Sequence, residues 1–150
     1  MLEVIEGDLF DHSHNFDAIG HGVNLEGVMG SGIAVIFRKM FPAMFEGYRT
    51  ACRENHIAPG EIYPWYDVPR GTWVYNCATQ VRQGPNANYA LVALTAHHML
   101  VHAQKNGVKS IGIPTIGCGI GGLEWPRVQY IYKSVFAPVE DVTLTVVHKK

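Results

Sequence analysis

The sequence predicts an α/β fold, a three-layer α/β/α sandwich in which helices cover both faces of a central mixed sheet. Two observations lead to this prediction. Short apolar segments rich in β-branched residues alternate along the chain with longer segments whose apolar residues recur at helical spacing. At two places a strand segment leads through a glycine-dense loop into a helix segment. Strands that alternate with helices are typical of a sheet covered on both faces.

The first half of the chain is predicted to hold two strands and two helices. Residues 2–6 alternate apolar and acidic side chains, and residues 17–23 form a second strand candidate. The loop 27–32 follows, and its glycines permit backbone angles closed to other residues. Apolar residues then recur at helical spacing over 33–40 and again over 44–52, with a proline between the two runs.

The second half is predicted to begin with a hairpin, whose strands at 61–66 and 72–76 flank a turn at Arg70-Gly71. Residues 88–105 contain no Gly or Pro and end at Asn106-Gly107, which predicts the best-defined helix. The remaining predicted elements, in chain order, are a buried strand at 108–114, the glycine loop 117–122, a helix with Pro126 in its first turn and a strand at 142–147. No linker or repeat interrupts it, so we expect one domain over residues 1–150.

Composition excludes several classes of protein. The chain is 47% hydrophobic and balances 12 Lys and Arg against 13 Asp and Glu, which excludes disorder and charge-driven binding to nucleic acid or membranes. No stretch reaches the ~18 apolar residues of a membrane span, and the acidic first residues do not resemble a signal peptide. Cys52, Cys77 and Cys118 lack the spacing of a zinc site. We therefore expect a reduced, cytoplasmic protein without a metal or cofactor.

The two glycine loops are the strongest functional signal. Backbone N–H groups at a strand–helix junction, with the helix dipole behind them, hold phosphate groups. Gly117, Gly119 and Gly122 satisfy GxGxxG, yet a dinucleotide fold places that motif after its first strand, with an acidic residue about 20 positions later. A dinucleotide-dependent oxidoreductase is thus a disfavoured alternative. The purely structural alternative is that both loops are tight turns that bind no ligand.

Three motifs together resemble the macro domain family. They cover nearly the full length in the family's order, and they read Gly7-Asp8-Leu9, then Ala18-Ile19-Gly20-His21-Gly22-Val23-Asn24 with Met29-Gly30-Ser31-Gly32-Ile33-Ala34, then Ile113-Pro114-Thr115-Ile116-Gly117-Cys118-Gly119-Ile120-Gly121-Gly122-Leu123-Glu124-Trp125. Macro domains bind ADP-ribose and related nucleotides, so the resemblance implies a cleft for such a ligand at the strand ends. It does not choose among free ADP-ribose, its 1″-phosphate, and ADP-ribose attached to protein or nucleic acid.

The resemblance also implies roles for individual residues. Asp8 would accept a hydrogen bond from the adenine amine, Leu9 would offer a neighbouring backbone contact, and Asn24 would hold the distal ribose. The first loop would surround that ribose, and the second loop would cradle the pyrophosphate. The implied ligand-binding set is Asp8, Leu9, Asn24, Met29, Gly30, Ser31, Gly32, Ile33, Ala34, Thr115, Ile116, Gly117, Cys118, Gly119, Ile120 and Gly121.

Within the family the chain is similar to the branch with terminal ADP-ribose protein glycohydrolase, the DNA-ADP-ribose antitoxins and yeast ADP-ribose-1″-phosphate phosphatase. In the glycohydrolases of that branch, a lysine follows an Asn-x-x-Thr pattern and attacks the anomeric carbon. Here Asn76-Cys77-Ala78-Thr79 precedes Gln80, and Gly121 stands where the human-type enzyme has an aspartate. Gln is not a nucleophile, so among the enzymatic alternatives hydrolysis of the 1″-phosphate is favoured over cleavage of ADP-ribosylated macromolecules.

His21 and Asn24 are the candidate catalytic residues. An imidazole near the strand end could donate a proton to a leaving oxygen or activate water, and the alternative is a buried histidine with a structural hydrogen bond. Cys118 lies in a loop whose amide dipoles would lower a thiol pKa, yet we expect it to be inert. His98 and His102 lie one turn apart on a predicted helix, but no third metal ligand is in view.

Overall fold

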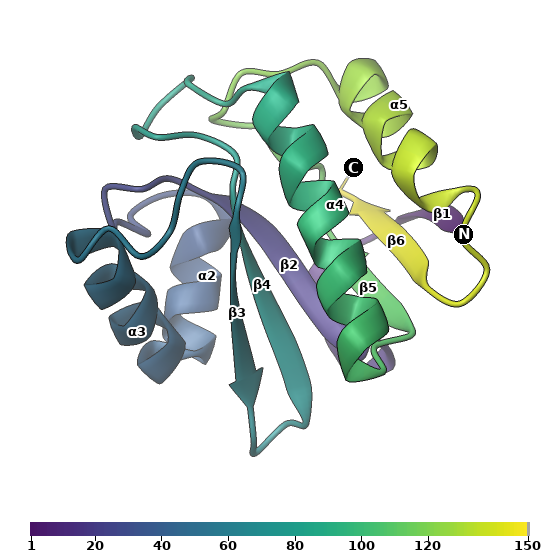
Figure 1. The fold of residues 1–150 in the computed structure, drawn as a ribbon, viewed down its shortest axis with the longest axis horizontal. Helices are drawn as coiled ribbons and strands as arrows, with labels where there is room; N and C mark the ends of the chain where they lie inside the picture. The colour runs from purple at the N-terminus through teal and green to yellow at the C-terminus, as the bar shows by residue number, and fades with distance from the viewer. Residues whose placement is uncertain (150) are drawn as a thin grey trace.

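The computed structural model describes residues 1–149 and contains the predicted alternation of strands and helices (Figure 1). The elements in chain order are β1 (Leu2–Glu6), α1 (Leu9–His12), the 3-10 turn η1 (Ser13–Asn15), β2 (Ala18–Val23), α2 (Ile33–Met40), α3 (Pro42–Arg53), β3 (Ile62–Asp67), β4 (Thr72–Ala78), α4 (Tyr89–Asn106), β5 (Ser110–Ile113), α5 (Trp125–Phe136) and β6 (Thr143–His148).

The strands form one six-stranded sheet in the order β1-β6-β5-β2-β4-β3. Only β3 and β4 pair antiparallel, and the other four neighbouring pairs are parallel. The sheet is therefore mixed, as predicted. The carboxyl ends of β1, β6, β5, β2 and β4 all lie at the same edge, so the loops that follow these strands are brought together there.

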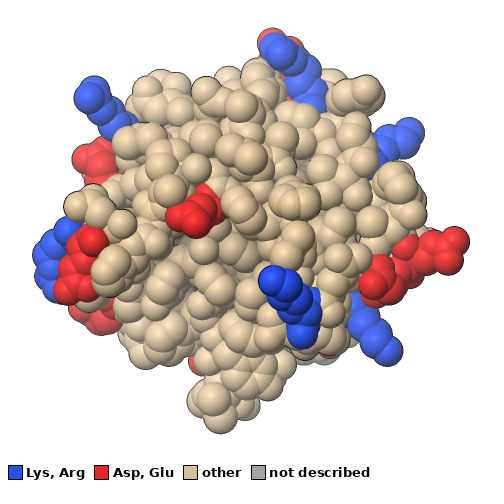
Figure 2. All heavy atoms as spheres, in the orientation of Figure 1, with Lys and Arg blue, Asp and Glu red and all other residues tan. Residues whose placement is uncertain are grey.

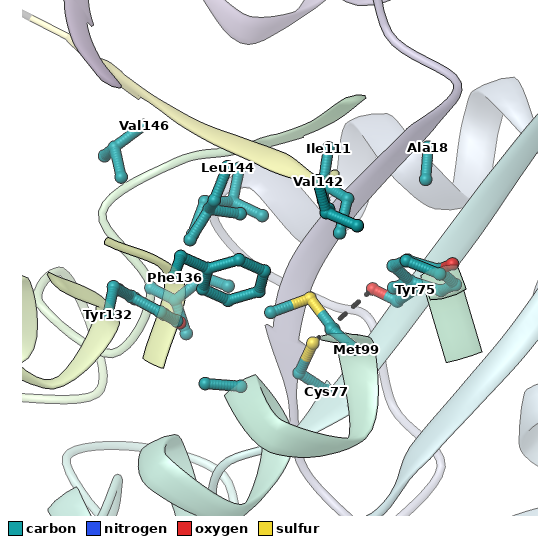
Figure 3. Close-up of a cluster of buried hydrophobic side chains, with 14 of the residues drawn as sticks. Ala18, Tyr75, Cys77, Met99, Ile111, Tyr132, Phe136, Val142, Leu144 and Val146 are labelled. Carbon is teal, nitrogen blue, oxygen red and sulfur yellow. Dashed lines mark hydrogen bonds between the residues drawn. The ribbon is translucent and has the colours of Figure 1, made fainter. Parts of the chain in front are cut away.

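Two buried clusters, one on each face of the sheet, hold the layers together. In the first, α4 and α5 pack on the sheet, and Figure 3 shows Phe136, Met99 and Leu144 meeting between these helices and the strands. In the second, α1, α2 and α3 cover the opposite face through residues such as Phe37 and Met44. This arrangement confirms the predicted three-layer sandwich. On the face that α4 and α5 cover, Lys, Arg, Asp and Glu lie scattered rather than gathered by sign (Figure 2).

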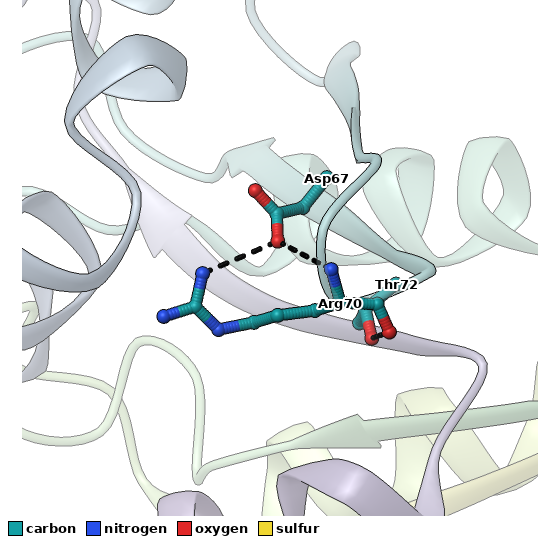
Figure 4. Close-up of polar contacts among 3 residues, drawn as sticks. All are labelled: Asp67, Arg70 and Thr72. Carbon is teal, nitrogen blue, oxygen red and sulfur yellow. Dashed lines mark hydrogen bonds and ion pairs between the residues drawn. The ribbon is translucent and has the colours of Figure 1, made fainter.

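The boundaries of the elements follow local signals in the sequence. Asn88 caps α4 because its Oδ1 accepts a hydrogen bond from the N–H of Ala90 at 2.8 Å, and Gly107 ends the helix in the left-handed conformation. The hairpin turn also lies where predicted. There the Asp67 carboxylate accepts hydrogen bonds from the backbone N–H and the guanidinium of Arg70, both at 3.2 Å (Figure 4).

The structure contains one helix that the sequence did not predict, the four-residue α1 directly after β1. No helix among residues 1–149 is long and apolar enough to cross a membrane.

Candidate ligand-binding cleft

A cleft of about 480 Å³ lies at the edge of the sheet where the parallel strands end. Its lining comes from the segments that follow β1, β2, β4, β5 and β6. Neighbouring strands in a sheet are about 4.8 Å apart, so the segments after β1 and β4, four strand spacings apart, are separated by about 19 Å. The cleft is therefore elongated across the strands. We call the end at β1 and β6 the acidic end, after Asp8, and the end at β4 the amide end, after Gln80.

At the acidic end, Asp8 has two separate interactions. Its Oδ1 accepts a hydrogen bond from the N–H of Phe10 at 2.9 Å, which caps α1. Its Oδ2 lies 3.5 Å from the Lys149 ammonium, which is 80% exposed. Leu9 lines the cleft from the buried side of this end. Because the cap uses only Oδ1, Oδ2 is the Asp8 oxygen left to receive a ligand's donor.

The first glycine loop is shaped by Asn24. Its Oδ1 accepts hydrogen bonds from the N–H of Glu26 at 3.0 Å and from the hydroxyl of Tyr48 at 3.1 Å. Its Nδ2 donates to the carbonyl of Val28 at 2.9 Å. Asn24 does line the cleft, as expected, but most of its hydrogen-bonding capacity holds the loop.

The first loop ends at the N-terminus of α2. Gly32 has a φ of 60° and no side chain caps the helix, so its first N–H groups lack side-chain partners. Gly30, Ser31, Gly32, Ile33 and Ala34 all line the cleft. Unpaired N–H groups at the positive end of a helix dipole favour an anion.

The second glycine loop, after β5, is tightly packed at some positions and open at others. A Cβ at Gly121 would lie 2.7 Å from the carbonyl oxygen of Gly117 and 2.8 Å from the Cβ of Ala87, so no side chain fits there. Gly119 has open space around it. The cleft is lined by Thr115, Ile116, Gly117, Gly119, Ile120 and Gly121.

The amide end is a wall made by Thr79, Gln80, Gln83 and Gly84 after β4, and of these four residues the family resemblance had singled out only Gln80. The Gln80 Nε2 donates to the carbonyls of Arg82 at 2.6 Å and Gly84 at 3.0 Å. The wall is joined to the first loop, because the N–H of Gln83 donates to the Glu26 carboxylate at 2.8 Å. Gln80 lies four residues after the end of the predicted strand 72–76, and the signal in the sequence for its place was its correspondence with the lysine of the related glycohydrolases.

Three residues of the expected site do not line the cleft: His21, Met29 and Cys118. His21 is fully buried, its ring stacks on Phe37 with centroids 3.8 Å apart, and its Nε2 lies 2.7 Å from the Oδ1 of Asn76. Burial lowers the pKa of His21 to about 4. The structure thus gives His21 the environment of the structural alternative, on the α2 side of the sheet and away from any ligand.

The other two residues pack in or against the buried clusters. Met29 is 1% exposed and packs in the cluster beneath the first loop. The Cys118 thiol lies 3.4 Å from the carbonyl of Ile116, and burial raises its pKa to about 11. A thiol with a raised pKa is a poor nucleophile at neutral pH, in agreement with the inert cysteine expected.

The helical histidines have structural partners. The Nδ1 of His98 lies 2.8 Å from the carbonyl of Gly60, and the Nδ1 of His102 lies 2.8 Å from the Tyr75 hydroxyl. Residues 1–149 contain no group of three or more His, Cys, Asp or Glu side chains that could hold a metal ion.

Comparisons with known proteins agree with this geometry. The chain is 28% identical over 148 residues to the DNA ADP-ribosyl glycohydrolase of Thermus aquaticus, covering 97% of this chain and 41% of that protein. It is 30% identical over 146 residues to the ADP-ribose glycohydrolase OARD1 of Bos taurus, covering 97% and 90% of the two chains. A shorter match, 37% over 62 residues, joins 41% of this chain to 35% of an ADP-ribose 1″-phosphate phosphatase of Meyerozyma guilliermondii.

Among solved structures, the macrodomain of Thermus aquaticus DarG superposes with a TM-score of 0.89 at 27% identity, covering 98% of this chain and 97% of that one. The model of the macro domain family matches residues 21–132. The chain therefore belongs to the macro domain family.

Proposed function

We propose that the chain binds ADP-ribose, free or attached to a protein or nucleic acid, in the cleft at the carboxyl edge of the sheet. The order of chemical groups along the cleft is the observation that carries this proposal. A carboxylate stands at one end, two glycine loops stand in the middle, the first of them at the uncapped N-terminus of α2, and amides stand at the other end. A purine amine, a pyrophosphate and a ribose diol need these groups in this order.

Each part of the ligand then has a chemically suited partner. The Oδ2 of Asp8 accepts from the adenine amine, and the backbone of Leu9 lies beside it. The N–H groups of the second loop hold the pyrophosphate, and we assign to it also those that follow Gly32, although the resemblance implies that the first loop surrounds the distal ribose. The distal ribose lies toward the amide end, near Asn24 and Gln80. The 480 Å³ cleft has the volume of a small-molecule site.

Binding without hydrolysis is favoured by the positions of the ionisable side chains. Among the described residues, the cleft is lined by two such side chains, Asp8 and Lys149, and both stand at the acidic end. A glycosidic bond at the distal ribose would lie at the amide end. There, among the described residues, no Lys, His, Asp or Glu lines the cleft, and Gln80 and Gly121 stand where the resemblance implies a lysine nucleophile and, in the human-type enzyme, an aspartate.

Titration calorimetry with ADP-ribose tests the proposal. We expect saturable heat and an increase in melting temperature that grows with ligand concentration. No heat and no thermal shift at millimolar ADP-ribose would contradict it.

Hydrolysis of ADP-ribosylated macromolecules is the second candidate, because two of the relatives above are glycohydrolases by name. Incubation with ADP-ribosylated DNA or protein would then release ADP-ribose. If Asn24→Ala left such release unchanged, Asn24 would be excluded from catalysis.

We further propose that residues 1–150 act as one domain and that the protein works in the cytoplasm. The three cysteines are all unpaired in the structure, which supports a reducing compartment.

A further inference from the structure

The two ends of the cleft differ in charge. Lys149 is the cation among the described lining residues, and it stands beside Asp8 at the acidic end. The strand order places this pair about 19 Å from the segment that follows β4. Among the described residues, no Lys, Arg or His side chain therefore lines the amide end.

The orientation of the Gln80 amide adds to this difference. Two carbonyl oxygens, those of Arg82 and Gly84, lie within hydrogen-bond distance of the Gln80 Nε2. A carbonyl accepts and cannot donate, so these partners fix the NH₂ group on their side and leave Oε1 as the free end of the side chain. Both N–H bonds of the amide are used. Toward a ligand, Gln80 thus offers only an acceptor.

The neighbours of Gln80 add polar groups but no cation. Asn24 donates one N–H to the carbonyl of Val28, and the lining side chains of Thr79 and Gln83 are neutral. The Glu26 carboxylate accepts from the N–H of Gln83 but, like the exposed Arg82 side chain, it does not line the cleft. The amide end is accordingly suited to a neutral group that exchanges hydrogen bonds with amides, such as a hydroxyl.

We propose that the amide end selects ADP-ribose whose distal ribose carries a hydroxyl or a glycosidic bond, and rejects a ligand with a phosphate monoester there. A phosphate monoester carries about −1.5 to −2 charges at pH 7 and is bound best by cations. At the amide end it would meet neutral amides and the Gln80 Oε1 instead. This inference rests on the proposed binding of ADP-ribose, and it makes the 1″-phosphate the wrong ligand for this cleft.

The test compares the dissociation constants of ADP-ribose and ADP-ribose-1″-phosphate by titration calorimetry at pH 7.5 and constant salt. We expect ADP-ribose to bind at least about tenfold more tightly, since the phosphate would be left without a cationic partner. Equal or tighter binding of the 1″-phosphate would overturn the inference, because donors such as the N–H groups of α2 would then be serving it. If neither ligand binds, the proposed function itself fails, which is a separate outcome.

Two substitutions isolate the contribution of charge at Gln80. Gln80→Lys and Gln80→Met both lose the amide that holds the loop, but only the lysine adds a cation. The informative quantity is the ratio of the two dissociation constants, because a loosened loop weakens both ligands. Relative to Gln80→Met, we expect Gln80→Lys to shift this ratio at least about fivefold toward the 1″-phosphate. The same ratio in both variants would overturn the inference.

Arg82→Ala provides a further control on the exposed cation of this loop. We expect it to leave the ratio unchanged, because the Arg82 side chain does not line the cleft. A selective loss of 1″-phosphate binding in this variant would show that Arg82 reaches the ligand and would overturn the neutral description of the amide end. Melting temperatures of all three variants exclude unfolding as the cause.

Discussion

Asp8 is the residue at which ligand recognition and folding can be separated most sharply. One carboxylate oxygen caps α1 through the N–H of Phe10, and the other is the proposed acceptor for the adenine amine. Asp8→Ala removes both functions. Asp8→Asn keeps a carbonyl oxygen that can cap the helix, but its second group is an NH₂ that faces the amine donor to donor.

The magnitudes follow from these two contacts. Loss of an N-cap costs about 1 kcal/mol, which for a chain of this length lowers the melting temperature by about 2–4 °C. Loss of a hydrogen bond to a charged acceptor costs about 1.5–3 kcal/mol, or about 10- to 150-fold in affinity. Asp8→Asn should therefore bind ADP-ribose at least tenfold more weakly with little change in melting temperature. Asp8→Ala should show both losses.

The assay is titration calorimetry of wild type and both variants with ADP-ribose, and with a ribose-5-phosphate fragment that lacks adenine. The fragment controls for indirect effects, because the variants should differ from wild type only when the base is present. Lys149→Met is a further control, because it removes the exposed ion pair with Asp8. An exposed ion pair contributes little, so we expect this variant to bind ADP-ribose with a dissociation constant within about threefold of wild type.

Undiminished ADP-ribose binding by Asp8→Asn would refute the base-reading role of Asp8. A loss of affinity that is equally large for the fragment would refute it as well, because the cause would then lie in the shape of the cleft.

Three further outcomes are expected. Gly119→Val should weaken ADP-ribose binding at least about tenfold in calorimetry with an almost unchanged melting temperature, because the position lies in open space at the cleft. Gly121→Ala should lower the free energy of unfolding in urea by about 1–3 kcal/mol, since its Cβ would meet the Gly117 carbonyl at 2.7 Å. The pKa of about 4 for His21 means that the unfolded chain takes up this proton from about pH 6.5 downward and the folded chain only near pH 4. Stability should fall by about 3 kcal/mol across that interval in urea titrations, and His21→Gln should remove this part of the fall.

The sequence predicted the elements whose signals are local. Asn88 and Gly107 mark the ends of α4 because a cap and a left-handed residue are each recognisable from a few neighbouring residues. The hairpin at Arg70-Gly71 was found for the same reason. The helix α1 was missed because four residues are too few to show helical periodicity. The one local signal for this helix was Asp8, a residue type that commonly caps helices.

Apart from Gln80, the amide end was missed because its place depends on strand order. Nothing within residues 79–84 indicates that β4 lies beside β2, yet this pairing is what brings Gln80 to the glycine loops. The sequence left both interpretations of His21 open for a different reason. Successive side chains of a strand point to opposite faces, and an alternation of polar and apolar neighbours normally shows which face is which. Here the neighbours are Gly20 and Gly22, so the sequence contained no such pattern.

The packing around Gly121 and Gln80 bears on whether a single substitution could supply a catalytic group to this cleft. A position without a catalytic group holds either a gap or other atoms. At Gly121 the space is filled by Ala87 and the Gly117 carbonyl, so an aspartate could not be introduced without moving the second loop. At Gln80 the side chain has two carbonyl partners, and a lysine ammonium would either lose them or keep them by turning its charge away from the ligand. Both positions are therefore built into the wall of the cleft, and a single substitution at either one should not create a glycohydrolase.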